Sequence, residues 1–258
     1  MTYVIAEMGS SWLYGKPGTE ISHGLRLLHD CAAAGASAVK VQWTSDATKM
    51  ARRRKVAAEA YAPLAWPINW HAVLADEAHD HGMQYIVTVF LPEDVAAVHP
   101  FVDRYKVASL EWRSGSLRDA LDNQDKPVIY SVGGSDGGEL RGAFRVKDWV
   151  LHCTSAYPCP PCDMNLAVLD DQTYEGLSDH SGRVETGALA VMRGAKVLEV
   201  HVRLFETPPE NPDHPHSLDP AQFDQYVSFV HLAEMMLGDG KKRVMPSERG
   251  IRKHRVRR

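Results

Sequence analysis

The sequence has few cysteines, no long hydrophobic run and no large excess of charge of one sign. Four cysteines in 258 residues are too few for a disulfide-dense framework. The N-terminus carries no secretory signal, so we expect a cytoplasmic protein. The short apolar runs exclude a membrane-spanning helix, and a net charge of −4 provides no field that would recruit nucleic acid.

Short β-branched runs alternate with longer amphipathic segments along the chain. The region 43–68, rich in Lys, Arg and Pro, is expected to be a loop with at least one helical turn. The predicted helices include 21–34, 70–81, 184–193 and 220–237, and the predicted strands are 3–7, 38–42, 85–90, 103–108, 127–131, 149–153, 174–177 and 195–199.

Eight strands alternating with helices predict an α/β fold, a single-domain (βα)₈ TIM barrel over residues 1–240. The basic segment 241–258 is expected to be a flexible tail. An open doubly wound sheet is the competing architecture, and it would often have a Gly-rich turn after the first strand. Here that turn reads MGSSW (8–12), which is not a dinucleotide fingerprint.

Two histidines follow the last two predicted strands. His180 ends the motif LSDH (177–180), and His201 ends EVH (199–201). Neighbouring parallel strands lie about 5 Å apart, so both imidazoles are within reach of one metal ion. The spacing is equally compatible with two unrelated histidines, one solvated and one hydrogen-bonded in the core. The pair Cys159 and Cys162 has metal or redox spacing, but two intervening prolines also fit a stiff loop.

Polar side chains recur at the carboxyl ends of the predicted strands. Active sites of (βα)₈ barrels are built from this rim, and a charged residue in an apolar strand costs desolvation energy unless it has a partner. We therefore expect an active site here. The polar residues of the rim are Glu7, Lys40, Gln42, Thr88, Lys106, Ser109, Glu111, Ser131, Ser178, His180 and His201.

The residue types on this rim indicate a particular chemistry. Lys40 and Lys106, together with the serine hydroxyls, suit a bound phosphate. Glu7 and Glu111 are candidates for acid/base catalysis, and a metal held by the histidines would polarise a carbonyl. This combination predicts a phosphorylated substrate that reacts with an aldehyde.

Eight motifs in a fixed order extend these observations over nearly the whole chain. They are IAEMG (5–9), AGASAVKVQ (34–42), RYKVAS (104–109), KPVIYS (126–131), LHCTSAYP (151–158), GLSDHS (176–181), GAKVLEVH (194–201) and NPDHPHSLDP (211–220). On these motifs the chain resembles the N-acetylneuraminate (sialic acid) synthase family, whose catalytic domain is a (βα)₈ barrel. Each motif is weak alone, and the ordered set is specific.

The resemblance implies a metal-dependent transferase that joins phosphoenolpyruvate to the aldehyde of an N-acylated amino sugar such as N-acetylmannosamine. The products are a nonulosonic acid and phosphate. His180 and His201 would hold the divalent metal, usually Mn²⁺, with Mg²⁺ and Co²⁺ as alternatives. Glu7 and Glu111 would serve the sugar and the proton transfers. The residues implied to bind the substrates are Lys40, Gln42, Thr88, Lys106, Ser109, Ser131, Ser155, Tyr157, Ser178 and Asp213.

The chain departs from the family pattern mainly where the sugar would bind, for example at Trp12, Trp43 and Ser155. The sequence also stops at Arg258, where family members usually continue into an antifreeze-like domain. That domain is expected to be absent, separately encoded or removed by truncation, and a homodimer is expected by resemblance. Two alternatives remain: a related barrel enzyme that uses a different aldehyde, and a barrel that binds its ligand without turnover.

Overall fold

A computed structural model describes residues 1–136, 139–140, 144–171 and 173–256 of the chain. Eight parallel strands form a closed barrel, in which β1 pairs with both β2 and β8. The prediction of a single-domain (βα)₈ barrel is therefore confirmed. The strands are β1 (Tyr3–Gly9), β2 (Ala38–Gln42), β3 (Gln84–Thr88), β4 (Arg104–Val107), β5 (Val128–Ser131), β6 (Trp149–His152), β7 (Gly176–Asp179) and β8 (Val197–His201).

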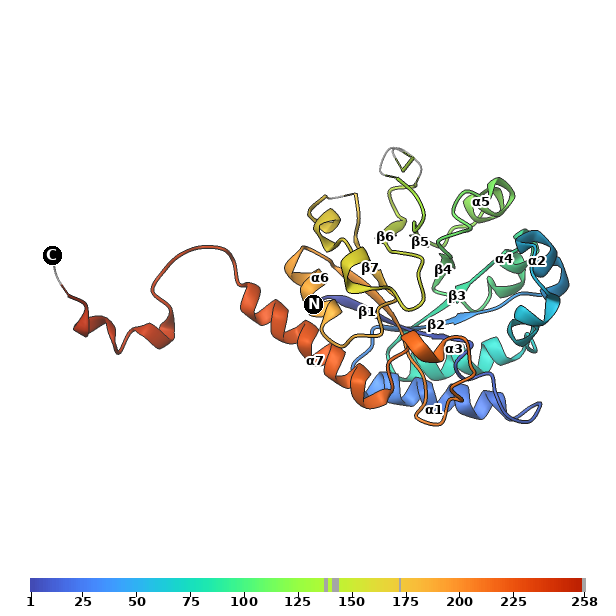
Figure 1. Ribbon diagram of the computed structural model, residues 1–258, viewed down its shortest axis with the longest axis horizontal. Helices are drawn as coiled ribbons and strands as arrows, with labels where there is room; N and C mark the ends of the chain where they lie inside the picture. Colours follow the sequence, from blue (N-terminus) through green and yellow to red (C-terminus); the bar gives the residue numbers. More distant parts are fainter. Residues whose placement is uncertain (137–138, 141–143, 172, 257–258) are drawn as a thin grey trace.

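Helices surround the strands (Figure 1). They are α1 (Glu20–Ala33), α2 (Ala47–Arg54), α3 (Trp70–Asp80), α4 (Pro92–Val98), α5 (Gly115–Asp122), α6 (Thr186–Met192) and α7 (Pro220–Leu237). The start of α7 follows from its sequence. Asp219 accepts a hydrogen bond from the backbone N–H of Gln222, and Pro220 occupies the first helical position, where no N–H is needed.

The predicted and observed strands differ mainly at their ends. The strand predicted at 174–177 is β7, Gly176–Asp179, and β8 extends two residues beyond its predicted end to include His201. Gly176 allows β7 and β8 to pair closely. A Cβ at this position would lie 1.7 Å from the backbone oxygen of Val197, so the close approach of β7 and β8 requires glycine.

The barrel interior is divided into an apolar and a polar layer. Side chains two residues apart on a strand share a face. The layer nearer the amino ends of the strands is an apolar cluster of Ile5, Ala38, Ile86, Ile129, Leu151 and Val197. Two residues further along each strand, the side chains that share this inner face include Glu7, Lys40, Thr88, Ser131 and Glu199, all buried. The polar residues are thus held at the carboxyl end of the barrel by strand periodicity.

The region 43–68 contains helical turns, as predicted. It contains α2 and two short 3₁₀ turns, Ala58–Ala60 and Ala62–Leu64. Asp46 caps α2 by accepting a hydrogen bond from the N–H of Lys49. This insertion places Arg53 and Arg54, at the last turn of α2, beside the carboxyl end of the barrel.

Beyond α7 the chain runs away from the barrel (Figure 1). The described part of this segment contains two 3₁₀ turns, Pro246–Glu248 and Arg252–His254. Within the described ranges, none of the helices combines the length and apolar character needed to cross a bilayer.

Candidate active site

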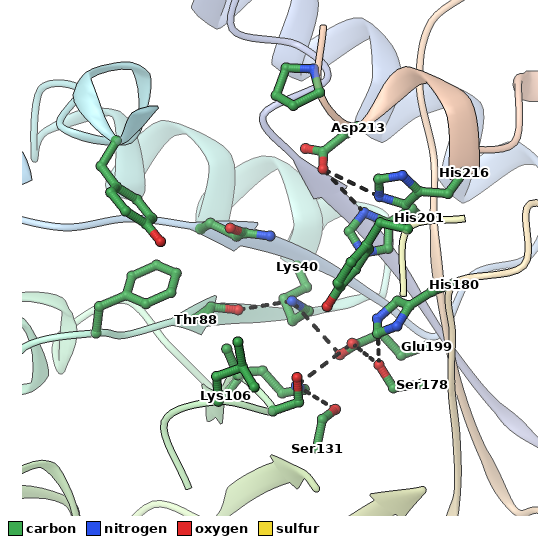
Figure 2. Close-up of a pocket in the computed structure, with 18 of the residues that line it drawn as sticks. Lys40, Thr88, Lys106, Ser131, Ser178, His180, Glu199, His201, Asp213 and His216 are labelled. Atoms are coloured by element: carbon green, nitrogen blue, oxygen red, sulfur yellow. Dashed lines mark hydrogen bonds and ion pairs between the residues drawn. The ribbon is translucent and has the colours of Figure 1, made fainter. Parts of the chain in front are cut away.

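A cavity of about 340 Å³ opens at the carboxyl end of the barrel. Figure 2 shows the side chains that point into it from several strands and from the segment after β8. The cavity is lined by Lys40, Gln42, Arg54, Tyr61, Thr88, Phe90, Lys106, Ala108, Ser109, Leu110, Ser131, Tyr157, Ser178, His180, Glu199, His201, Pro212, Asp213 and His216.

Two buried lysines share one carboxylate at the base of this cavity. Glu199 Oε2 lies 3.7 Å from Lys40 Nζ, and Glu199 Oε1 lies 3.6 Å from Lys106 Nζ. Lys40 also forms an ion pair with Glu7, which follows from their opposition in the β1–β2 ladder. Buried charges must be paired, so each ammonium group here has a carboxylate partner.

The three charges differ in how burial and neighbours move their pKa values. Burial would raise the pKa of Glu199, but Lys106 and Lys40 hold it below its usual value. Burial lowers the pKa of Lys106, and Glu199 offsets part of that effect. For Lys40 the carboxylates of Glu199 and Glu7 outweigh burial and raise the pKa. The base of the cavity therefore holds two buried lysines whose ammonium forms are favoured by carboxylates, an arrangement suited to an anion.

Glu7 is fully buried and contacts the lining residues Lys40 and Gln42. Burial raises its pKa, and the charge of Lys40 only partly opposes this effect. Its Oε1 accepts a hydrogen bond of 2.9 Å from the Gln42 amide. A carboxyl with a raised pKa next to a bound substrate is suited to proton transfer.

Hydroxyl groups complete the anion site. Lys106 Nζ donates to Ser131 Oγ at 2.7 Å, and Lys40 Nζ donates to Thr88 Oγ1 at 2.8 Å. Ser178 Oγ donates to Glu199 Oε1 at 2.7 Å, as expected for residues that face each other in the β7–β8 ladder. These contacts orient the ammonium groups and leave hydroxyl oxygens and protons facing the cavity.

The predicted histidine pair does meet at this mouth. The ring centroids of His180 and His201 are 5.5 Å apart. His180 Nδ1 lies 2.9 Å from the Thr154 carbonyl oxygen, a contact that assigns the proton to Nδ1 and turns Nε2 toward the cavity. Burial lowers the pKa of His180 to about 4 and that of His201 well below its usual value. Neutral imidazoles are the form that binds metals.

A carboxylate lies close to the second histidine. Asp213 Oδ1 is 3.8 Å from His201 Nδ1 and 3.4 Å from His216 Nε2. Its other oxygen, Oδ2, accepts hydrogen bonds from the Ser10 backbone N–H and hydroxyl. Gly9 permits this contact, because its φ is +49° and a Cβ there would lie 2.4 Å from Asp213 Oδ2.

These donors fit a metal ion. Within the described ranges, the buried His201 Nδ1 has no hydrogen-bond partner, although it faces the carboxylate of Asp213. A buried polar atom without a partner is costly, and a metal ion would satisfy it. Imidazole and carboxylate ligands suit divalent first-row metals.

Glu111 is placed differently from the other predicted site residues. Its carboxylate forms ion pairs with Arg53 and Arg54, the latter at 2.8 Å, at the rim of the cavity. Ser155 also lies behind the lining, where its hydroxyl is 2.7 Å from that of Ser109. The structure brings all other predicted residues to the cavity wall except Glu7, which pairs with the lining residue Lys40.

Among the charged and imidazole side chains that line the cavity, three carry no role in the sequence-based prediction: Arg54, Glu199 and His216. Glu199 had a signal, because it is a charged residue inside the apolar strand 195–200. Arg54 had none, and His216 lies in the motif 211–220 but without an indication of its role, since the strand pattern does not determine the path of either segment.

Comparisons with known proteins show the family and the fold of the chain. The model of the NeuB family matches residues 27–242. The chain belongs to the NeuB family. It is similar to pseudaminic acid synthase of Campylobacter jejuni subsp. jejuni, with 30% identity over 93% of this chain and 76% of that protein. It is also similar to N,N'-diacetyllegionaminic acid synthase of Legionella pneumophila, with 31% identity over 70% of this chain and 56% of that protein.

The fold of this NeuB-family chain also has a solved counterpart. It is similar to N-acetylneuraminic acid synthetase from Leptospira borgpetersenii, with a TM-score of 0.85 and 24% identity over 98% of this chain and 90% of that one. The predicted resemblance to sialic acid synthases is confirmed, and the protein is an enzyme, a phosphoenolpyruvate-condensing transferase. NeuB-family enzymes are generally metal-dependent, which agrees with the donors described above.

Proposed function

We propose that this enzyme condenses phosphoenolpyruvate with the aldehyde of an N-acylated amino sugar to give a nonulosonic acid and phosphate. The observation that carries the proposal is the convergence of Lys40, Lys106, His180 and His201 on one cavity. An anion site and a candidate metal site in the same mouth suit one phosphorylated and one carbonyl substrate.

Phosphoenolpyruvate is assigned to the base of the cavity. Its phosphate and carboxylate are matched by the ammonium groups of Lys40 and Lys106 and by hydroxyls that lie beside them. Thr88 and Ser131 already contact these lysines, and Ser178 contacts Glu199 between them. Ser109 is on the cavity wall, and Ser155 supports it from behind.

The acceptor is assigned to the outer part of the cavity. Gln42, Tyr157 and Asp213 line it, and Glu111 positions Arg54 at its rim. A divalent metal ion held by His180 and His201, which we propose is Mn²⁺ with Mg²⁺ or Co²⁺ as substitutes, would polarise the aldehyde. The four free cysteines suit the cytoplasm as the site of this reaction.

The bond changes define what the protein must provide. The methylene carbon of phosphoenolpyruvate bonds to the aldehyde carbon, whose oxygen takes a proton, and water adds at the enol carbon as phosphate leaves. Glu7, with its raised pKa and its contacts to Lys40 and Gln42, is placed to exchange one of these protons. Lys40 and Lys106 stabilise the charge on the leaving phosphate.

The test is phosphate release from phosphoenolpyruvate in the presence of Mn²⁺ and a panel of aldehydes, with the mass of each product measured. N-acyl amino sugars, including N-acetylmannosamine, are expected to give product. Phosphate release with simpler aldehydes but with none of the N-acyl amino sugars would favour the alternative of a related barrel enzyme that uses a different aldehyde. Binding of phosphoenolpyruvate without release for any aldehyde would favour a non-catalytic barrel.

A further inference from the structure

His216 is a buried imidazole beside the candidate metal site. It ends the 3₁₀ turn His214–His216 and is only 2% exposed. Neither of its ring nitrogens makes a hydrogen bond within the described part of the chain. A buried histidine normally satisfies at least one nitrogen. Here the carboxylate of Asp213 faces Nε2 at 3.4 Å without a hydrogen bond of good geometry, an arrangement that leaves the ring available to a ligand.

The ring lies against the candidate metal site (Figure 2). Its centroid is 4.5 Å from that of His201, closer than the 5.5 Å between His180 and His201. One ligand atom from each of His201, Asp213 and His216 lies within 4.8 Å of the other two. An ion with bonds of about 2.0–2.2 Å spans atoms up to roughly 4.4 Å apart, so small rotations would bring the three onto one ion.

The carboxylate in this group is already oriented for such a role. Asp213 Oδ2 is held by two hydrogen bonds from Ser10, which leaves Oδ1 directed at both imidazoles. Outer contacts of this kind fix the orientation of metal ligands and raise metal affinity.

We propose that His216 and Asp213 are metal ligands alongside His201 and His180. The centre then has three imidazoles and one carboxylate. This inference rests on the proposed function only for the presence of a metal ion. Imidazole ligands bind Co²⁺ and Zn²⁺ more tightly than they bind Mn²⁺ and Mg²⁺. The third imidazole therefore shifts the selectivity of the centre toward Co²⁺ and Zn²⁺.

The test is calorimetric titration of metal-free enzyme with CoCl₂ and, separately, MnCl₂, without substrates. His216→Phe replaces the imidazole with a ring of similar size, and His214→Phe is the matched control in the same turn. We expect His216→Phe to weaken Co²⁺ binding at least about tenfold, the loss seen even for outer contacts of a metal site. Mn²⁺ binding is expected to weaken less, and His214→Phe to stay within about twofold of wild type.

Co²⁺ binding to a folded His216→Phe variant within about twofold of wild type would overturn the assignment. Circular dichroism and thermal unfolding of the metal-free variants establish that they are folded. If His216→Phe does not fold, spin-echo modulation spectroscopy of the Mn²⁺-loaded wild type, with ¹⁵N-labelled histidine, counts the coordinated imidazoles. Three support the proposal, and two overturn it.

The same measurements separate this inference from the proposed function. A wild-type enzyme that binds metal through three imidazoles but releases no phosphate from phosphoenolpyruvate would retain the centre and contradict the proposed reaction. Phosphate release by an enzyme whose metal ion has only two coordinated imidazoles would support the proposed reaction and contradict the assignment of His216 as a ligand.

Discussion

Glu199 Oε1 lies 3.6 Å from the ammonium nitrogen of Lys106. Both side chains are buried at the base of a cavity whose shape and hydroxyl groups suit an anion. The carboxylate favours the ammonium form of the lysine, because burial alone lowers the pKa of Lys106 and Glu199 opposes that effect. This pair therefore links the pH range of the enzyme to its affinity for phosphoenolpyruvate.

Glu199→Gln is predicted to move the alkaline limb of kcat/KM for phosphoenolpyruvate to lower pH. Without the carboxylate, the field that favours the ammonium form of Lys106 is lost and its pKa falls further. The neutral amine then binds phosphate poorly at a pH where the wild type is still charged. The measurement is a pH–rate profile for both proteins, and alkaline limbs that coincide would contradict the role given to Glu199.

Lys106→Ala is predicted to raise the KM for phosphoenolpyruvate about 10–100-fold. The reason is the loss of a charged hydrogen-bond donor, worth about 1.5–3 kcal/mol. The KM of the acceptor should change less than about threefold. Lys126→Ala is the control, because Lys126 donates instead to the backbone oxygens of His99 and Val102. If steady-state kinetics show the same dependence on phosphoenolpyruvate for Lys106→Ala and Lys126→Ala, Lys106 does not belong to the site.

Glu111→Gln is predicted to lower the free energy of unfolding by about 1–3 kcal/mol, since it leaves two guanidinium groups without their charged partner. The Glu111 carboxylate pairs with both Arg53 and Arg54. Because Arg54 lines the cavity, the KM of the acceptor should rise more than that of phosphoenolpyruvate. Urea unfolding and kinetics check the two effects. Unchanged stability together with a large fall in kcat would instead indicate direct proton transfer by Glu111.

His71→Phe is predicted to reduce the loss of stability in acid. Burial lowers the pKa of His71 to about 3, whereas an unfolded histidine titrates near 6.5. Between these values the unfolded chain binds the extra proton, so stability is full above pH 6.5 and falls as the pH drops toward 3. One such group accounts for about 1.4 kcal/mol per pH unit.

The comparison is urea unfolding of wild type and His71→Phe between pH 4 and 7. The variant loses the hydrogen bond to Tyr85, so it should be less stable at neutral pH. Its stability should nevertheless depend less steeply on pH. Parallel pH dependences would show that His71 does not titrate as its burial requires.

The alternation of strands and helices made much of the barrel and its polar rim predictable. Lys40, Lys106 and His201 lie at or just past the carboxyl ends of predicted strands, a position that predicted a common rim, and the structure places all three on the cavity wall. Parts of the site outside the strands were harder to predict. Arg54 lies on a helix inserted after β2, and His216 lies on a turn after β8. Their positions depend on long-range packing that has no period in the sequence.

The partner of Glu111 was likewise not predictable. A glutamate after a strand is equally suited to proton transfer and to an ion pair, and only the fold brings α2 to it.

The most direct test of the account is the ³¹P relaxation of phosphoenolpyruvate bound to the Mn²⁺-loaded enzyme without an acceptor. Because the ammonium groups and imidazoles line one cavity, the paramagnetic ion is predicted to shorten the phosphorus relaxation times strongly, and His201→Ala or Lys106→Ala should abolish the effect. If phosphoenolpyruvate and Mn²⁺ both bind to the wild type but the phosphorus signal keeps its unperturbed relaxation, the two sites are not in one mouth and the account is contradicted.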